Sequence, residues 1–374
     1  GHDRSGDIST VFPSATVHML PIYGLYPGET TTVELTLDTG EYVDLSITAE
    51  DIDSVLTQAE VTAAADLSDE SLSDTASTDS EGSSSLTFVC VSTADGGSYG
   101  AAAYDQNGDL RWILKTTEGT VLPMKRLKNG RLMRSSSQII HGNYYASGLT
   151  EFDLCGKYYT EYLIPGGQHH DFVELENGNL LVCSSQEDFS SVEDRIVEID
   201  RKTGEVVYEL NVSDLIDPSD GGSLNQTDSD WCHNNSIDYD PDTDTILLSC
   251  RHLDAVLGIE KNTSTLKWVL GDPKGFSSVP AEKFFTPVHT ENGFEWQYAQ
   301  HNASFLPGGD ILLFDNGTHR TKKGYEDLAV TGDSVYSRAV RYHIDPESMT
   351  IEQVWSYGKE RGREWYSSFI SGVT

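Results

Sequence analysis

The clearest pattern in the chain is a series of short apolar stretches separated by polar turns. One kind of unit is a strand, a turn and a strand that ends on an aromatic or branched residue, as in "RIVEIDRKTGEVVYELN" (195–211). The other kind carries Gly or Asp in its turn, as in "QHNASFLPGGDILLFDNG" (300–317). Together they give four strands at intervals of about fifty residues or more, which is typical of the blades of a β-propeller. The pattern therefore predicts an all-β fold.

Composition and pattern divide the chain into three predicted parts. The stretch "TTVELTLDTGEYVDLSI" (31–47) has the alternation and turn of a β-hairpin, so residues 1–65 are predicted to form a small β domain. Residues 66–86 are rich in Ser, Asp and Glu and cannot bury enough apolar surface to fold, which predicts a flexible acidic linker. Residues 87–374 would form the propeller.

The propeller is predicted to be incomplete at its C-terminal end. About five blades can be counted, and the sequence stops at Thr374 as another blade would begin. An open propeller would leave two unpaired sheet edges. We therefore expect its closing strands either to have been removed by processing or to be supplied by a second chain.

Charge narrows the range of partners. Asp and Glu number 60 against 25 Lys and Arg, which gives a formal net charge of −35. A nucleic acid needs a basic face, and anionic lipid attracts basic segments, so both are excluded as partners. The apolar runs are too short to cross a bilayer, so no membrane insertion is expected. An acidic, solubilising surface is typical of exported proteins, and with Gly1 at the start we expect a mature or trimmed product.

Three histidines share a position at the start of a predicted innermost strand. His170 lies seven positions before the turn residue Asn177, and His301 lies seven positions before Gly308. His233 opens the blade between them, with a slightly longer turn. Because innermost strands line the central channel of a propeller, the three imidazoles are predicted to converge near its axis.

Three converging imidazoles suit either a metal site or an anion site. Arg251 ends the strand "TDTILLSCR" that follows His233, so we expect it beside that histidine. A guanidinium there would repel a cation and favour a sulfate or phosphate group, which predicts an anion site without a metal ion. The alternatives are a metal- or anion-binding propeller with hydrolase activity, and a scaffold that is not an enzyme. The five cysteines show no CxxC spacing and predict no structural zinc.

Several stretches, in order between Tyr104 and Ser371, resemble the bacterial arylsulfate sulfotransferases. These are "WCHNNSIDYD", "LLSCRH", "YAQHNASF", "LFDNG", "YSRAVRYHID" and "EQVWSYGKERG". The resemblance implies a six-bladed β-propeller with a small N-terminal β-sandwich domain. It also implies transfer of a sulfuryl group from an aryl sulfate to a phenol, without phosphoadenosine phosphosulfate or any cofactor. The reaction would be ping-pong, through a sulfohistidine.

The resemblance also assigns site residues. It implies that His301 is the nucleophile and that the other members of the site are His233, Asn235, Arg251 and His170, with His169 as the alternative to the last. In this mechanism Arg251, His170 and Asn235 donate hydrogen bonds to the sulfuryl oxygens. His233 protonates the leaving phenolate and later deprotonates the incoming phenol. The ring nitrogen of His301 that does not attack is expected to donate to an acceptor that fixes the tautomer.

This chain departs from the family at one site position. Ile370 stands where the family has a threonine, and Ser371 follows it. The remaining partners implied are small aryl sulfates and phenols, a homodimer through the N-terminal domain, and export to the periplasm, cell surface or medium. Two further features are expected to be structural. The aspartates of "DYDPDTD" (238–244) would form an exposed acidic turn rather than a calcium loop, and His252 would point away from Arg251 on its strand.

Overall fold

The computed structural model describes residues 11–52, 86–90, 99–105, 107–115 and 123–373. Strands dominate these ranges, and every helix in them is a 3-10 turn of three to seven residues, so the predicted all-β class is confirmed. None of these turns has the length and apolar character needed to cross a membrane. The chain forms two compact units, one of residues 1–132 with 151–160 and the other of residues 133–150 with 161–374.

The first unit contains the predicted N-terminal hairpin. Strand β1 (Thr30–Thr36) pairs antiparallel with β2 (Tyr42–Thr48), which confirms the hairpin expected from the alternating pattern. Three further strands form a small sheet in the order β3-β4-β5: β3 (Thr87–Cys90), β4 (Tyr99–Tyr104) and β5 (Leu110–Lys115). The short β6 (Met124–Arg126) follows. Residues 66–85 of the predicted linker lie outside the described residues.

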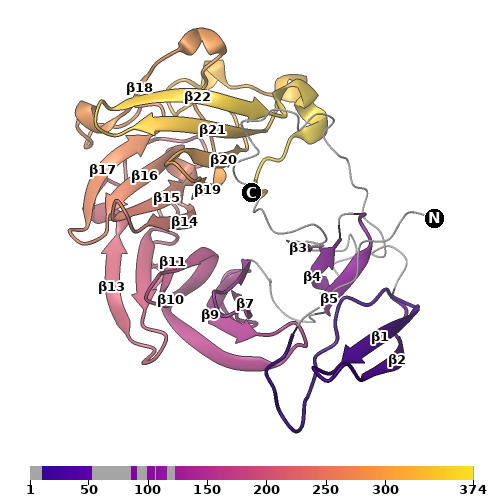
Figure 1. The fold of residues 1–374 in the computed structure, drawn as a ribbon. Coiled ribbons are helices and arrows are strands. Elements are labelled where there is room, and N and C mark those ends of the chain that lie inside the picture. The colour runs from indigo at the N-terminus through magenta and orange to yellow at the C-terminus, as the bar shows by residue number, and fades with distance from the viewer. Residues whose placement is uncertain (1–10, 53–85, 91–98, 106, 116–122, 374) are drawn as a thin grey trace. The chain divides into compact units, whose positions relative to one another are not determined.

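The next sheet is curled, as its strands β13, β11, β10 and β9 show in Figure 1, and most of it belongs to the second unit. Its strand order is β13-β12-β11-β10-β9-β7-β6, with β8 paired to β9. Its strands are β7 (Leu132–Ser135), β8 (Ile139–His141), β9 (Tyr145–Phe152), β10 (Tyr158–Glu174), β11 (Leu180–Ser184), β12 (Arg195–Ile199) and β13 (Val206–Asn211). The hairpins β10–β11 and β12–β13 are antiparallel, as the two kinds of repeat predicted.

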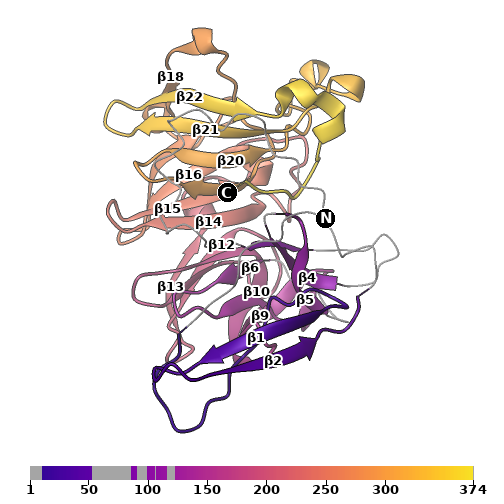
Figure 2. The ribbon, with the colours of Figure 1, turned by 45° about the vertical axis from the view of Figure 1, so that its right-hand side comes forward.

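Two further sheets repeat this arrangement. One has the order β14-β15-β16-β17, with β14 (Asn234–Asp240), β15 (Thr245–Cys250), β16 (Ala255–Glu260) and β17 (Thr265–Leu270). The other consists of β19 (His301–Phe305), β20 (Ile311–Asp315), β21 (Arg338–Asp345) and β22 (Thr350–Tyr357), with β18 (Thr286–Pro287) parallel to β22. Figure 2 shows these two sheets side by side.

The middle sheet is buried on both of its faces. Along β15, Ile246 and Leu248 pack into one apolar cluster with residues of β11 and β12, whereas Leu247 packs into a second cluster with residues of β20 and β21. A strand covered on both sides has no solvent face, and this explains why β15 is apolar without alternation. The packing is close: a Cβ atom at Gly258 would lie 2.1 Å from the Trp268 ring.

Hydrogen bonds tie the innermost strands of neighbouring sheets together. The Asp171 carboxylate on β10 accepts from the backbone N–H of Ile237 on β14 at 3.1 Å. One sheet further, the Ser236 hydroxyl accepts from the N–H of Ala303 on β19 at 2.8 Å. These bonds link β10 to β14 and β14 to β19, and the three histidines lie within β10, directly before β14 and at the start of β19.

Candidate active site

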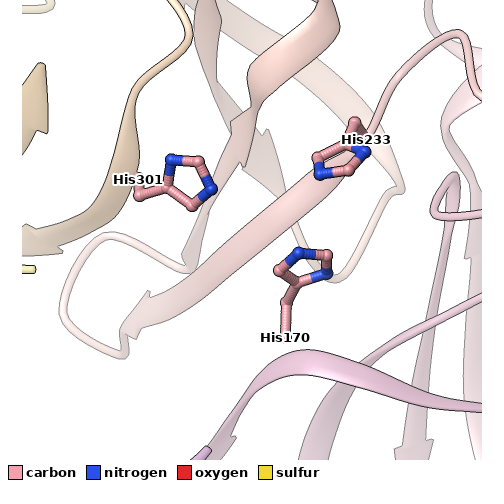
Figure 3. Close-up of side chains that lie close together, drawn as sticks. All are labelled: His170, His233 and His301. Carbon is pink, nitrogen blue, oxygen red and sulfur yellow. The ribbon is translucent and has the colours of Figure 1, made fainter. Parts of the chain in front are cut away.

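The structure brings His170, His233 and His301 together. His170 lies within β10, His233 directly precedes β14, and His301 begins β19. The ring of His170 lies 4.9 Å from that of His233 and 6.4 Å from that of His301, measured between centroids. Figure 3 shows the three rings pointing toward one another. The predicted convergence is confirmed, whereas the chemical roles of the three stay predictions.

Irregular backbone aims these side chains. Each inner strand has a register shift beside its histidine, on β10 between Gln168 and Phe172, and correspondingly on β14 and β19. His170 and His233 have φ angles of 51° and 55°, in the left-handed region that non-glycine residues rarely occupy. Bulges and such strained residues concentrate at functional sites because they re-aim side chains.

His301 is held as a neutral imidazole with a defined tautomer. Its Nδ1 donates to the Asn316 Oδ1 at 2.7 Å, and the Asn316 Nδ2 is itself occupied by the carbonyl oxygens of Ser367 and Ile370. The expected acceptor is therefore Asn316, and Nε2 keeps its lone pair. Burial lowers the pKa of His301 to about 3; the hydrogen bond to Asn316 opposes this, and the positive charges of His233 and Arg251 reinforce it.

His233 has the opposite protonation state. Its Nδ1 lies 2.7 Å from a Glu193 carboxylate oxygen and 2.9 Å from an Asp230 carboxylate oxygen. Burial alone would lower the pKa of this imidazole, but the two carboxylates outweigh burial and raise the pKa to about 9. At neutral pH the cluster therefore pairs one charged histidine with one neutral histidine.

Glu193 is a member of the cluster that the sequence did not reveal. Its carboxylate is fully buried, and its Oε1 accepts hydrogen bonds from the hydroxyls of Tyr144 and Tyr145, the second at 2.7 Å. Burial would raise the pKa of this carboxyl, but the charges of His170 and His233 hold it well below its usual range. Glu193 also has a left-handed φ of 57° and precedes β12 in an irregular segment where no periodic pattern marks it.

Arg251 lies where it was expected, beside His233. Its backbone N–H donates to the His233 carbonyl at 3.0 Å. The guanidinium Nη2 donates to the Ser368 carbonyl at 3.4 Å, and its buried Nε has no partner in the described part of the chain. A buried guanidinium with an unused donor is suited to binding an anion.

The prediction that His252 points away from this cluster is wrong. Strand β15 ends at Cys250, and Arg251–Leu253 form the 3-10 turn η3, so the alternation of a strand does not apply. The His252 ring lies 4.4 Å from the His233 ring, and its Nε2 lies 2.6 Å from the Arg251 Nη1. His252 therefore contacts both neighbours rather than the opposite face.

The other predicted positions lie close to this cluster. Asn235 donates through Nδ2 to the carbonyl of Gln300, the residue before His301, at 2.7 Å. His169 is buried, and its Nδ1 lies 3.1 Å from the Nδ1 of His170. The ring contacts with His233 and His301 are made by His170.

At the position of the family threonine, it is the backbone that contacts His301. The N–H of Ile370 lies 3.3 Å from the Nε2 of His301, with Ile370 at a left-handed φ of 59°. The Ser371 hydroxyl instead donates to the Ser367 hydroxyl at 3.0 Å.

Carboxylates of the acidic turn at 238–244 accept hydrogen bonds from backbone N–H groups of the protein. Asp238 accepts from the backbone N–H of Phe305, Asp240 from that of Asp242, and Asp244 from that of Asn262. Within the described residues, the groups compact enough to hold a metal ion do not include these aspartates. This agrees with the interpretation as a structural turn.

The histidines themselves are compact enough to hold a metal ion, since one nitrogen from each lies within 4.8 Å of the others. A metal would require an unprotonated nitrogen on His233 and would lie close to the Arg251 charge. A neutral imidazole, a charged imidazole and a buried guanidinium define instead a class of site suited to transferring an anionic group.

The comparison with known sequences places the chain in one family. The sequence profile of the arylsulfotransferase family (ASST) matches residues 72–374, and the chain belongs to this family. It is 29% identical over 336 residues to the "Arylsulfate sulfotransferase AssT" of Escherichia coli O6:H1 (strain CFT073), covering 71% of this chain and 54% of the relative. The enzyme of the same name from Lelliottia amnigena is 27% identical, covering 72% and 54%. The chain thus spans about half the length of these curated relatives.

Similarity to solved structures is weaker. A selenium-binding protein from Sulfolobus tokodaii gives a TM-score of 0.44 at 12% identity, covering 73% of this chain and 64% of that protein. A similarity at this level carries no argument about function.

Replacing Asn316 with Ala should allow the neutral His301 imidazole to adopt both tautomers. In the unaltered protein the imidazole should show a single form protonated at Nδ1, because Asn316 can only accept there. The variant should show a mixture of the two neutral tautomers. Nitrogen NMR of ¹⁵N-histidine-labelled protein, with the His301 signals assigned from a His301→Ala variant, measures this. Asn177→Ala, in an exposed turn, is the matched control, and an unchanged His301 spectrum in Asn316→Ala would contradict the assignment.

Proposed function

We propose that this protein transfers a sulfuryl group from an aryl sulfate to a phenol through a sulfohistidine on His301, without phosphoadenosine phosphosulfate. The observation that carries the proposal is the protonation state of His301. Its Nδ1 is bound to Asn316, so Nε2 carries the lone pair, which accepts only a long hydrogen bond from the Ile370 N–H at 3.3 Å, and burial keeps the ring neutral. A neutral imidazole nitrogen is a competent nucleophile toward sulfur. Family membership and the names of the two relatives support the same chemistry.

In the donor half-reaction, the His301 Nε2 attacks the sulfur of the aryl sulfate. The N–S bond forms as the S–O bond to the aryl oxygen breaks, and the electron pair of that bond stays on the phenolate. His233 is protonated and can supply a proton to this oxygen, so the phenol leaves neutral. The sulfuryl group then remains on His301.

The acceptor half-reaction reverses these steps with a second phenol. Neutral His233 takes the proton of the incoming hydroxyl, whose oxygen attacks the sulfur as the N–S bond breaks. The same residues serve both half-reactions, which gives ping-pong kinetics. His233 returns to its charged form and His301 to its neutral form.

Hydrogen-bond donors stabilise the transferring group. In a loose transition state the charge lies on the peripheral oxygens, so positioned donors contribute most of the catalysis. Arg251 has an unused buried donor, and His170 lies between the other two histidines. Asn235 has a second amide hydrogen beyond the one that it gives to Gln300. The Ile370 N–H, next to the His301 Nε2, is a further candidate donor that would stand in for the threonine of the family.

Wider aspects of the proposal rest on the family resemblance. They include closure into a six-bladed propeller. They also include a homodimer formed through the N-terminal domain, and export to the periplasm, cell surface or medium.

Removing the nucleophile should abolish transfer. His301→Ala should release no phenol from an aryl sulfate and form no sulfated acceptor, because it lacks the attacking nitrogen. Loss of Arg251 should cost about 2–4 kcal/mol of transition-state stabilisation, the size found for oxyanion donors. The assay is phenol release and acceptor sulfation, followed by chromatography. His343→Ala, an exposed histidine on β21, is the matched control and should keep full activity.

The same assay separates the competing functions. A transferase should turn over much faster when a phenol acceptor is added, whereas a sulfatase that uses water should not respond. Removal of metal ions by a chelator should leave transfer unchanged, and a loss that added zinc or copper restores would favour the three-histidine metal site. Normal transfer by His301→Ala would show that the nucleophile is another residue.

The value of kcat/KM should fall at two pH values that are unusual for histidine side chains. His301 must be neutral, so kcat/KM should fall only as pH drops toward about 3, the pKa of His301. His233 must be protonated to assist the leaving group, so kcat/KM should fall as pH rises through about 9. The measurement is kcat/KM for phenyl sulfate, which reports the free enzyme, from about pH 4 to about pH 10. A limb centred near 6.5, the ordinary value for histidine, would contradict these assignments.

A further inference from the structure

Two carboxylates meet at a single nitrogen of His233. The Glu193 Oε2 lies 2.7 Å and the Asp230 Oδ2 2.9 Å from Nδ1, and the imidazole side chain itself is 13% exposed. Glu193 is fully buried and Asp230 is 25% exposed. Neither residue was singled out by its sequence pattern, and one carboxylate would be enough to orient the ring.

The position of Glu193 is fixed from several sides. Its Oε1 is occupied by the hydroxyls of Tyr144 and Tyr145, and its Oε2 forms a close ion pair with His233 at 2.7 Å, whereas the carboxylate aligned for a hydrogen bond to Nδ1 is that of Asp230. Its backbone N–H donates to the Ser185 hydroxyl at 3.0 Å, and its carbonyl accepts from the N–H of Asn234 at 2.8 Å. A buried carboxylate in a left-handed backbone conformation costs free energy, so such a residue persists where it serves a function.

The other charged and titratable groups around His233 come from three elements. They are His169 and His170 on β10, Arg251 and His252 on η3, and His301 on β19. The positive Arg251 and any charge on a neighbouring imidazole disfavour a proton on His233. The two carboxylates are the largest influences that favour it, and they keep the ring charged against its burial.

The second nitrogen of His233 is the one left for chemistry. Both carboxylates lie at Nδ1, and within the described residues Nε2 has no hydrogen-bond partner. The proton on Nε2 is therefore the one that can be exchanged with a substrate oxygen.

We propose that Glu193 and Asp230 are positioning residues that hold His233 as an Nε2–H acid for aryl oxygens. This inference rests on the proposed sulfuryl transfer. In it, the Nε2–H bond breaks as the O–H bond of the leaving phenol forms, and the reverse occurs with the acceptor. No other reactant is needed.

The proton on His233 matters for the departure of phenols of ordinary acidity. Tyrosine, a phenol of ordinary acidity, has a pKa of about 10. An imidazolium with a pKa of about 9 is protonated at neutral pH, whereas one with the ordinary pKa near 6.5 would be mostly neutral and could not supply a proton. The carboxylates should therefore matter most when the leaving group is an unactivated phenol, which needs a proton, and least when it is a stable phenolate.

Glu193→Gln tests the inference through a readout that does not depend on catalysis. The titration of the His233 ring, followed by NMR of ¹⁵N-histidine-labelled protein and assigned with a His233→Gln variant, should move from about 9 to lower pH. Asp230→Asn should move the His233 titration in the same direction by a smaller amount, because Asp230 is partly exposed. This variant provides the test if Glu193→Gln does not fold. Glu198→Gln is the matched control. Its carboxylate lies on the nearby β12 and holds Asn179 and Lys261, so it should leave the titration unchanged.

Two donors of different leaving-group acidity supply the kinetic test. Phenyl sulfate needs a proton on its leaving oxygen, so Glu193→Gln should lower its kcat/KM by roughly 10²-fold, the size of general acid catalysis. 4-Nitrophenyl sulfate expels a stable phenolate and should lose far less. In Glu193→Gln, the alkaline pH at which kcat/KM for phenyl sulfate falls should decrease by the same amount as the pH of the His233 titration.

Two results would overturn the inference: a His233 titration unchanged in both carboxylate variants, or equal losses for the two donors. A merely structural role for Glu193 would lower the activity toward both donors equally. If the unaltered protein turned over neither donor, the proposed function would fail, and the His233 titration would then decide the role of the carboxylate pair alone.

Discussion

Burial of the middle sheet on both faces is the constraint on which the rest of this structure depends. Strand β15 contributes Ile246 and Leu248 to one core and Leu247 to the other, so neither face of that sheet is available for chemistry. Polar groups can then gather only at strand ends and in the turns beyond them. The inner strands are tied across the sheets by bonds such as that of Asp171 to the backbone of Ile237, and this brings three such ends together. The site is thus a consequence of how the sheets pack.

Within the site, the groups bound to each imidazole determine whether it is charged, because burial alone would leave both His233 and His301 neutral. Burial disfavours the charged form of both His233 and His301. His301 faces a neutral amide at Nδ1 and stays neutral, whereas His233 faces two carboxylates and stays charged. Opposite protonation states a few ångströms apart are what a reaction needs when one group attacks and another donates a proton. The chemistry therefore depends as much on Asn316, Glu193 and Asp230 as on the histidines.

Sequence reasoning found the parts of the site that follow a repeated pattern. The strand–turn–strand units predicted the hairpins, and the position of His170 and His301 before their turns predicted that the rings converge. It missed Glu193 and Asp230 because both lie in irregular segments, where only three-dimensional packing decides which side chain reaches the site. It was wrong about His252 because β15 ends at Cys250, one residue before the predicted strand end, and a 3-10 turn replaced the expected alternation. The bulges that aim the histidines likewise have no sequence signal that a single chain reveals.

The most direct test of the central claim, that His301 carries the transferring group, is intact-protein mass spectrometry after brief incubation with a chromogenic aryl sulfate. We expect the protein to gain one sulfuryl group, mapped to His301 by peptide analysis under conditions that preserve the N–S bond, and discharged when a phenol is added. Absence of an adduct while phenol-dependent transfer proceeds, or an adduct mapped to another residue, would contradict the account.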